Sequence, residues 1–173
     1  DFAKKLLGVS HKVTKELKDF MATLPFELTG AQKRVMREIV NDMKSPYAMN
    51  RLIQGDVGSG KTVIAAISLF IAVKDGFQGA LMAPTEVLVV QHYEFLKEIM
   101  TPFGIEVGLI TGSTTAKQKR ELIARAKAGE LHVLVGTHAL IEDPVEMPNL
   151  GLVITGERIA LVGPTGAGKT TFK

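Results

Sequence analysis

The segment at 55–62, GDVGSGKT, has the residue types and spacing that hold a phosphate group. Its three glycines let the backbone approach a ligand closely and adopt positive φ angles. Successive N–H groups then face inward as an anion-binding nest, and the positive end of the following helix adds to it. The lysine is placed to contact the β- and γ-phosphates of a nucleotide, and the threonine hydroxyl to hold Mg²⁺. The expected cradle consists of Gly55, Asp56, Val57, Gly58, Ser59, Gly60, Lys61 and Thr62.

The segments around this loop predict an α/β fold. A short apolar run precedes the loop, and the long apolar segment 63–73 follows it with the composition of a helix. Further apolar runs alternate with helical patterns, which implies βαβ crossovers. We therefore expect a three-layer P-loop NTPase domain whose mostly parallel sheet is covered on both faces. The expected strands are Arg51–Gln54, Gly79–Ala83, Glu106–Ile110, His132–Val135, Gly151–Ile154 and Arg158–Val162.

Two helix starts carry the same capping signature. Thr29 with Gln32, and Thr115 with Gln118, have the spacing of a capping box. The N-terminal segment 1–23 is expected to be a helical lead-in packed on the domain, because apolar residues recur on one helical face. Those residues are Val13, Leu17, Phe20, Met21 and Leu24.

Composition limits the class of protein. A chain of 173 residues with 46% apolar residues is expected to form one globular domain. No cysteine is present, which fits a reducing compartment, and we expect a cytoplasmic protein. The apolar run at 63–73 is too short to span a bilayer, so no membrane partner is expected. The formal charge of +3 is compatible with a polyanion partner without demanding one.

Several sequence blocks together resemble the first RecA-like motor domain of RecG-type DNA helicases of superfamily 2. The resemblance covers residues 1 to about 154. It implies binding of ATP or ADP with Mg²⁺, and ATP-driven unwinding and branch migration of forked or branched DNA in repair and recombination. The blocks are LPFELTGAQKRVMREI at 24–39, RLIQGDVGSGKTV at 51–63, MAPTEVLVVQHY at 82–93, LITGS at 109–113, VGTHALI at 135–141 and NLGLVI at 149–154.

The resemblance also assigns binding residues. Gln32 occupies the place of a glutamine that binds adenine, although it is equally suited to be the partner in a capping box, and both roles hold only if the side chain is shared. Residues that match DNA-contacting motifs lie where strands are expected to end, the edge at which open α/β sheets bind ligands. They are Thr85, Gly112, Thr137 and His138. The basic segment 117–127 either meets phosphates or forms a solvated helix face.

The resemblance ends where such helicases carry an acidic box. Gly156 stands in the place of the aspartate, Glu157 in the register of the catalytic glutamate, and Ile159 in the place of the histidine. Glu157 is therefore either a substitute general base beside Lys61 or a coincidence of spacing. We expect hydrolysis far below the family's rates, and no unwinding by these residues without a second motor domain and its arginine finger.

The segment 155–173 instead resembles the strand and phosphate loop of an ABC-transporter ATPase, which suggests a recombined or engineered junction. Only three residues follow Thr170, so the helix that completes such a loop is missing, and we expect no independent second nucleotide site. This second loop contains Gly163, Gly166, Gly168, Lys169 and Thr170.

The connection between the last two expected strands is very short. A parallel crossover needs about a dozen residues, so the last strand is expected to be antiparallel or a bent continuation. Such a strand pairs at a sheet edge or with another chain, giving a monomer or a strand-exchanged dimer. Two functions remain open from the sequence: an ATP-binding helicase motor segment, and a chimeric P-loop scaffold that binds nucleotide or phosphate without turnover.

Overall fold

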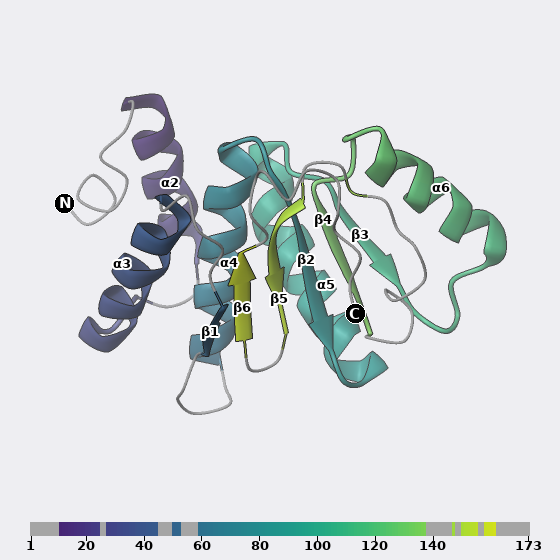
Figure 1. Cartoon of the computed structure of the whole chain (residues 1–173), viewed down its shortest axis with the longest axis horizontal. Helices are drawn as coiled ribbons and strands as arrows, with labels where there is room; N and C mark the ends of the chain where they lie inside the picture. Colours follow the sequence, from purple (N-terminus) through teal and green to yellow (C-terminus); the bar gives the residue numbers. More distant parts are fainter. Residues whose placement is uncertain are drawn as a thin grey trace.

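The fold is an α/β domain built on a six-stranded sheet with the strand order β1-β6-β5-β2-β4-β3 (Figure 1). The computed structural model describes residues 11–24, 27–44, 50–52, 59–137, 147, 150–155 and 158–161. The strands are β1 Asn50–Leu52, β2 Gln78–Ala83, β3 Val107–Ile110, β4 Val133–Thr137, β5 Leu150–Ile154 and β6 Arg158–Leu161. The helices are α2 His11–Thr23, α3 Gly30–Lys44, α4 Ser59–Lys74, α5 Glu86–Met100 and α6 Ala116–Lys127, with a 3₁₀ turn η1 at Thr101–Phe103.

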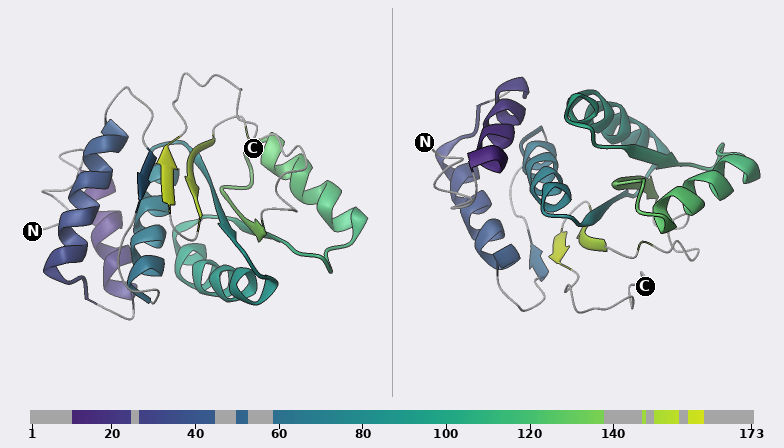
Figure 2. Two further views of the ribbon diagram at one scale, coloured as in Figure 1. Left: turned by 60° about the horizontal axis from the view of Figure 1, so that its bottom comes forward. Right: turned by 90° about the horizontal axis from the view of Figure 1, so that it is seen from above.

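Alternate residues of the central strands face two separate cores. Leu81 and Ala83 of β2 join the core under α4 and α5, whereas Ala80 and Met82 join the core on the side of α6. Figure 2 shows α4 and α5 on one face of the sheet and α6 on the other. The period of two along a strand produces this division, because successive side chains point to opposite faces. The prediction of an α/β fold with a largely parallel sheet is confirmed.

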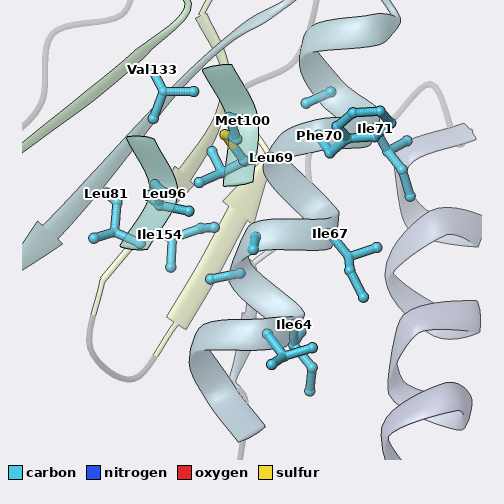
Figure 3. Packing of buried hydrophobic residues seen from close by; sticks show 14 of the residues in the cluster. Ile64, Ile67, Leu69, Phe70, Ile71, Leu81, Leu96, Met100, Val133 and Ile154 are labelled. Atoms are coloured by element: carbon cyan, nitrogen blue, oxygen red, sulfur yellow. The ribbon is translucent and has the colours of Figure 1, made fainter. Parts of the chain in front are cut away.

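Helix α4, which follows the first phosphate loop, is enclosed on all sides. Every residue from Val63 to Ala72 is buried, including Ser68, whose hydroxyl donates to the Ile64 carbonyl at 2.8 Å. The sheet lies on one side of α4, and α2 and α3 pack on it from the other. Figure 3 shows Leu69 on the sheet side near Leu96 and Met100, while Ile67 lies on the opposite side. A helix that is apolar all round is typical of this central position.

The N-terminal helix is fixed to the domain by an aromatic cluster and a lysine. Phe20 of α2 stacks on Phe70 of α4 with ring centroids 4.2 Å apart, and both meet Phe103 edge-on. Lys74 donates to the Phe103 carbonyl at 3.0 Å and pairs with Glu16 of α2 at 2.7 Å. The prediction of a helix packed on the domain through Leu17, Phe20 and Leu24 holds over the described part of this segment.

The last described strand reverses direction. β6 is antiparallel to β5, with Ile154 opposite Ile159, and antiparallel to β1, with Arg51 opposite Ile159. The short connection between Ile154 and Arg158 explains the antiparallel hairpin, and an antiparallel strand was one of the two arrangements predicted from that connection. The expectation that this strand pairs at an edge of the sheet is wrong, since β6 lies between β5 and β1. An interior position supplies ladder partners on both sides, so the described fold does not require exchange of this strand between chains.

Both predicted capping boxes are present. Thr29 and Gln32 exchange hydrogen bonds of 2.9 and 3.1 Å at the start of α3, and Thr115 and Gln118 exchange bonds of 3.0 and 3.1 Å at the start of α6. Within the described residues, no helix is long and apolar enough to cross a membrane.

Candidate nucleotide and DNA sites at the carboxyl edge of the sheet

Three of the residues predicted to contact DNA lie at one edge of the sheet. β2, β4 and β3 are adjacent and parallel, with Ala83 opposite Thr137 and Ile110 opposite Gly136. Thr85 therefore follows the end of β2, and Gly112 follows the end of β3, on either side of Thr137. The predicted fourth residue, His138, lies outside the described residues.

Thr85 is the N-cap of helix α5. Its backbone is extended, at φ −127° and ψ 154°, and its hydroxyl accepts a hydrogen bond from the Leu88 N–H at 3.2 Å. The side chain is exposed, and the next residue, Glu86, places a carboxylate in the first helical turn. A negative charge there is favoured by the positive end of the helix dipole.

The turn after β3 satisfies most of its own N–H groups. The Thr111 N–H donates to the Thr114 hydroxyl at 2.8 Å, and the Thr114 N–H donates to the Thr111 carbonyl at 3.1 Å. The Ser113 N–H donates to the Thr111 hydroxyl at 3.2 Å. The Gly112 N–H is directed elsewhere: it donates to the carboxylate of Glu86 in a short hydrogen bond.

The Glu86–Gly112 hydrogen bond joins the two outer members of this edge. Because β4 lies between β2 and β3, the bond connects the start of α5, which follows β2, with the loop after β3, across the end of β4. Sequence reasoning assigned no role to Glu86. The available signal was an acidic residue directly after an N-cap threonine, at a strand end that was already expected to bind a ligand.

A cavity of about 430 Å³ lies beside the same turn. Thr111, Ser113 and Thr114 contribute to its wall, together with Tyr93 of α5 and residues of β3 and α6. The turn thus faces this cavity as well as the carboxylate of Glu86.

The first phosphate loop lies between a strand and a helix, as predicted. β1 ends at Leu52 and α4 begins at Ser59, so Gly60, Lys61 and Thr62 fall in the first turn of α4. Thr62 is half-buried. Gly55, Asp56, Val57 and Gly58 lie outside the described residues.

Gln32 is engaged in the capping box at the start of α3. Its Oε1 accepts the Thr29 N–H at 2.9 Å, and the side chain is half-buried. A carbonyl oxygen has two lone pairs, so this hydrogen bond leaves one acceptor site on Oε1 for a second donor. The capping role is confirmed, and the adenine role stays a prediction that is compatible with it.

The remaining predicted site residues are largely beyond the described part of the chain. Gly156 and Glu157 are outside it. The second phosphate loop is outside it as well: Gly163, Gly166, Gly168, Lys169 and Thr170. Ile159, in the place of the family histidine, lies in the β6 ladder opposite both Ile154 and Arg51.

The basic segment on α6 lies largely in solvent. Lys117, Arg120 and Lys127 are exposed, and Lys119 is half-buried. Arg125 lies 3.6 Å from the carboxylate of Glu106, the residue before β3. Exposed ion pairs of this kind contribute little to stability. The exposed lysine and arginine side chains give this helix a mainly basic surface toward solvent.

His132 accepts a hydrogen bond from the residue before β3, at the amino end of this outermost strand. His132 Nδ1 accepts the Glu106 N–H at 2.9 Å, which requires the neutral ring. Burial lowers the pKa of His132; the Glu106 carboxylate acts in the opposite direction, and Lys74 and Arg125 lower the pKa further. Burial also lowers the pKa of His92 in α5.

The family model for DEAD/DEAH box helicases matches residues 29–157. The chain belongs to the DEAD/DEAH box helicase family. The matched segment contains β1, the first phosphate loop, and the strand ends that carry Thr85, Gly112 and Thr137.

Relatives and a solved structure give the same assignment. The ATP-dependent DNA helicase RecG of Bacillus subtilis is 55% identical over 143 residues, which are 83% of this chain and 21% of that protein. The RecG of Thermotoga maritima is 46% identical over 152 residues, 87% of this chain and 20% of that protein. A structure of RecG bound to a three-way DNA junction matches with a TM-score of 0.74 and 47% identity, over 80% of this chain and 19% of that chain. This DEAD/DEAH family chain thus spans about a fifth of the length of these relatives.

Proposed function

We propose that this chain is the ATP-binding motor domain of a helicase that unwinds branched DNA and drives branch migration in repair and recombination. The observation that carries the proposal is the bracketing of GDVGSGKT by strand β1 and the buried helix α4, in a family that uses ATP and Mg²⁺. The carboxyl end of β1, which precedes this loop in the sequence, points the same way as the strand ends that carry Thr85, Gly112 and Thr137. This follows because β1 and β5 both run antiparallel to β6, and β5 runs parallel to β2.

In this proposal the loop residues from Gly55 to Thr62 hold the phosphates. The N–H groups at the start of α4 and the Lys61 ammonium neutralise phosphate charge, and the Thr62 hydroxyl coordinates Mg²⁺. Gln32 binds the adenine while it keeps its bond to Thr29. These assignments follow from the resemblance and from the position of each residue on α3 and α4.

The DNA assignments follow from the hydrogen-bonding groups at the carboxyl ends of β2, β4 and β3. Hydroxyls and N–H groups are suited to sugar–phosphate contacts, which position a strand without selecting its sequence. Thr85, Gly112, Thr137 and His138 supply such groups. The related RecG structure is bound to a three-way DNA junction, which supports branched DNA as the partner of this chain.

A second candidate is nucleotide binding without turnover. It is favoured by β6, in which Ile159 is paired in a ladder at the place where the family has a histidine of its acidic box. In this reading Glu157 is no substitute base, and the chain holds ATP without efficient hydrolysis.

Calorimetry with ATP, ADP and Mg²⁺ tests the binding proposal, with Lys61→Ala as the matched variant. We expect micromolar binding that the variant weakens at least about a hundredfold, because it loses a charge-assisted phosphate contact. No binding at millimolar nucleotide would reject the proposal. Phosphate release then separates the two candidates: robust turnover that Lys61→Ala abolishes favours a working ATPase, and saturable binding without turnover favours the second candidate.

A further inference from the structure

The only described N–H in the turn 111–114 that leaves the turn is that of Gly112. The other three, those of Thr111, Ser113 and Thr114, donate to oxygens of the turn itself. The Gly112 N–H donates to the Glu86 carboxylate. This glycine amide is therefore the turn's one N–H that points at a partner on another element, and that partner is an anion.

Glycine makes room for this partner. A Cβ at position 112 would come within 2.6 Å of Glu86 Oε1, so a side chain there would displace the carboxylate from its present position. Both residues are exposed to solvent, which leaves the site open to an anion from outside.

We propose that the Glu86 carboxylate and a phosphate of the bound DNA strand compete for the Gly112 N–H. The proposal rests on the function proposed above, in which the Gly112 turn contacts DNA. An amide N–H has one hydrogen, so a phosphate oxygen that takes it in linear geometry displaces the carboxylate. In the DNA-free chain the Glu86 carboxylate occupies the position at the Gly112 N–H that a DNA phosphate oxygen would take. The carboxylate thereby lowers the affinity of the chain for DNA.

Two physical terms act in the same direction. A hydrogen bond to an ionised carboxylate is about twice as strong as one to a neutral amide, so the native bond is hard to replace. A carboxylate beside a phosphate also repels it, because like charges at contact distance disfavour each other. Glu86 is exposed, so once displaced its carboxylate is hydrated by water.

The same bond gives DNA binding a structural consequence. Glu86 is the first residue of α5, and Gly112 belongs to the loop between β3 and α6. When phosphate takes the amide, the link between these two elements is released. Binding of a phosphate at the Gly112 turn is thereby transmitted to the start of α5.

Fluorescence anisotropy with a labelled single-stranded oligothymidylate tests the competition in the 173-residue chain. The variants are Glu86→Gln and Glu86→Ala. The control is Glu94→Gln, an exposed glutamate of the same helix, displaced along the axis by about 12 Å. We expect both Glu86 variants to bind DNA about threefold to tenfold more tightly than the native chain.

Salt separates contact from long-range charge. The gain at Glu86 should persist as salt is raised, because it comes from a contact, whereas any gain in the control should disappear by screening. Equal gains in Glu86→Gln and Glu94→Gln would overturn the competition and leave the DNA proposal standing. Weaker binding by Glu86→Ala, with native binding by Glu86→Gln, would overturn it too, since Glu86 would then only position the turn.

The Gly112 amide gives a second readout by NMR. Its proton should resonate downfield in the native chain, shift upfield in Glu86→Gln, and move on DNA addition. A Gly112 amide that stays unchanged at DNA saturation, while neighbouring amides respond, would reject the competition. A native chain that shows no saturable DNA binding at low salt would reject the proposed DNA function and, with it, this inference.

Discussion

The two ends of the sheet differ in the relative direction of their strands. At one end, β2, β4 and β3 form parallel ladders, and their carboxyl ends carry polar residues joined by the Glu86–Gly112 bond. At the other end, β5, β6 and β1 form two antiparallel ladders beside the first phosphate loop. Three strand spacings, about 14 Å, separate β1 from β2.

Connection length accounts for the difference. Helices α5 and α6 link the parallel strands and give each crossover room to return in the same direction. Between Ile154 and Arg158 there is room only for a reversal. The β5-β6-β1 end of the sheet is therefore continuous but has one reversed strand, while the β2-β4-β3 end is parallel throughout. The following changes test whether the two ends behave as separate units.

The largest expected effect is from Ala160→Pro in β6. Ala160 pairs with both Asn50 and Val153, so every N–H of this strand faces a ladder, and proline removes one donor and leaves a carbonyl unpaired. We expect a loss of about 2 to 4 kcal/mol in the free energy of unfolding. Urea denaturation followed by circular dichroism measures it.

The control for this change is Ala116→Pro at the first position of α6. Thr115 before it has φ −70° and ψ 160°, a conformation that a following proline accepts. We expect native stability in the control. If Ala160→Pro is equally stable, β6 is not an interior strand and the comparison of the two ends fails.

The next effect concerns the β2-β4-β3 end of the sheet. Gln78 is buried at the start of β2, and its Nε2 donates to the carbonyls of Ala126 and Leu131 at 3.0 and 2.7 Å. Gln78→Met should cost about 1 to 3 kcal/mol, because both carbonyls lose a buried donor. Thermal melts compare it with Gln91→Met, an exposed change on α5 that should stay within about 0.5 kcal/mol of native. Equal melting temperatures would contradict this account.

The two capping boxes provide a matched pair. Thr29→Ala and Thr115→Ala should each cost about 1 kcal/mol, because the hydrogen bonds they remove are alike.

Glutamate at the third helical position keeps a capping box. We therefore expect Gln32→Glu to retain stability but weaken ATP binding about tenfold, by loss of the amide donor and by charge.

Gln118→Glu, in the capping box of α6, is the control and should bind ATP as the native chain does. Calorimetry supplies both affinities. Identical affinities in the two variants would assign Gln32 to capping alone.

The smallest effect is the pH dependence at His132. Its pKa is lowered in the fold, so between that value and the unfolded value near 6.5 the unfolded chain binds more protons. The contribution of the neutral ring is complete above pH 6.5 and is lost as the pH falls toward the lowered value. His132→Asn keeps an acceptor for the Glu106 N–H and does not titrate, so we expect a flatter stability curve below pH 6.5.

His92 contributes in the same direction, because its pKa is also lowered. The difference between native and His132→Asn curves isolates His132, since His92 is present in both. If urea denaturation at each pH gave parallel stability curves for the native chain and His132→Asn, His132 would not contribute to the pH dependence.

Much of the fold was predictable from local pattern. Apolar runs located every end of the six described strands to within two residues, and threonine–glutamine spacing located two helix starts. The GDVGSGKT segment predicted a strand before it and a helix after it, which the structure has. Of the predicted DNA residues, Thr85, Gly112 and Thr137 do lie along one edge, because parallel strands bring their carboxyl ends together.

The interior place of β6 was not predictable in this way. The short loop after Ile154 required the chain to reverse, but it did not specify on which side of β5 the next strand would pair. The neighbours of a strand depend on which other strands have unpaired backbone groups. The Glu86–Gly112 bond was missed for a related reason. Its two residues are 26 positions apart, and only the order β2-β4-β3 brings the start of α5 and the loop after β3 together.

The sequence by itself determined the strand before and the helix after the GDVGSGKT segment, two helix starts, the alternation of strands and helices, and the reversal before Arg158. These follow from interactions within a few residues along the chain, where spacing and backbone freedom decide the outcome. Only the tertiary structure decided that β6 lies beside β1 and that Glu86 holds the Gly112 amide. Those contacts depend on how the whole sheet is ordered, because distant segments meet only when the ladders between them have formed.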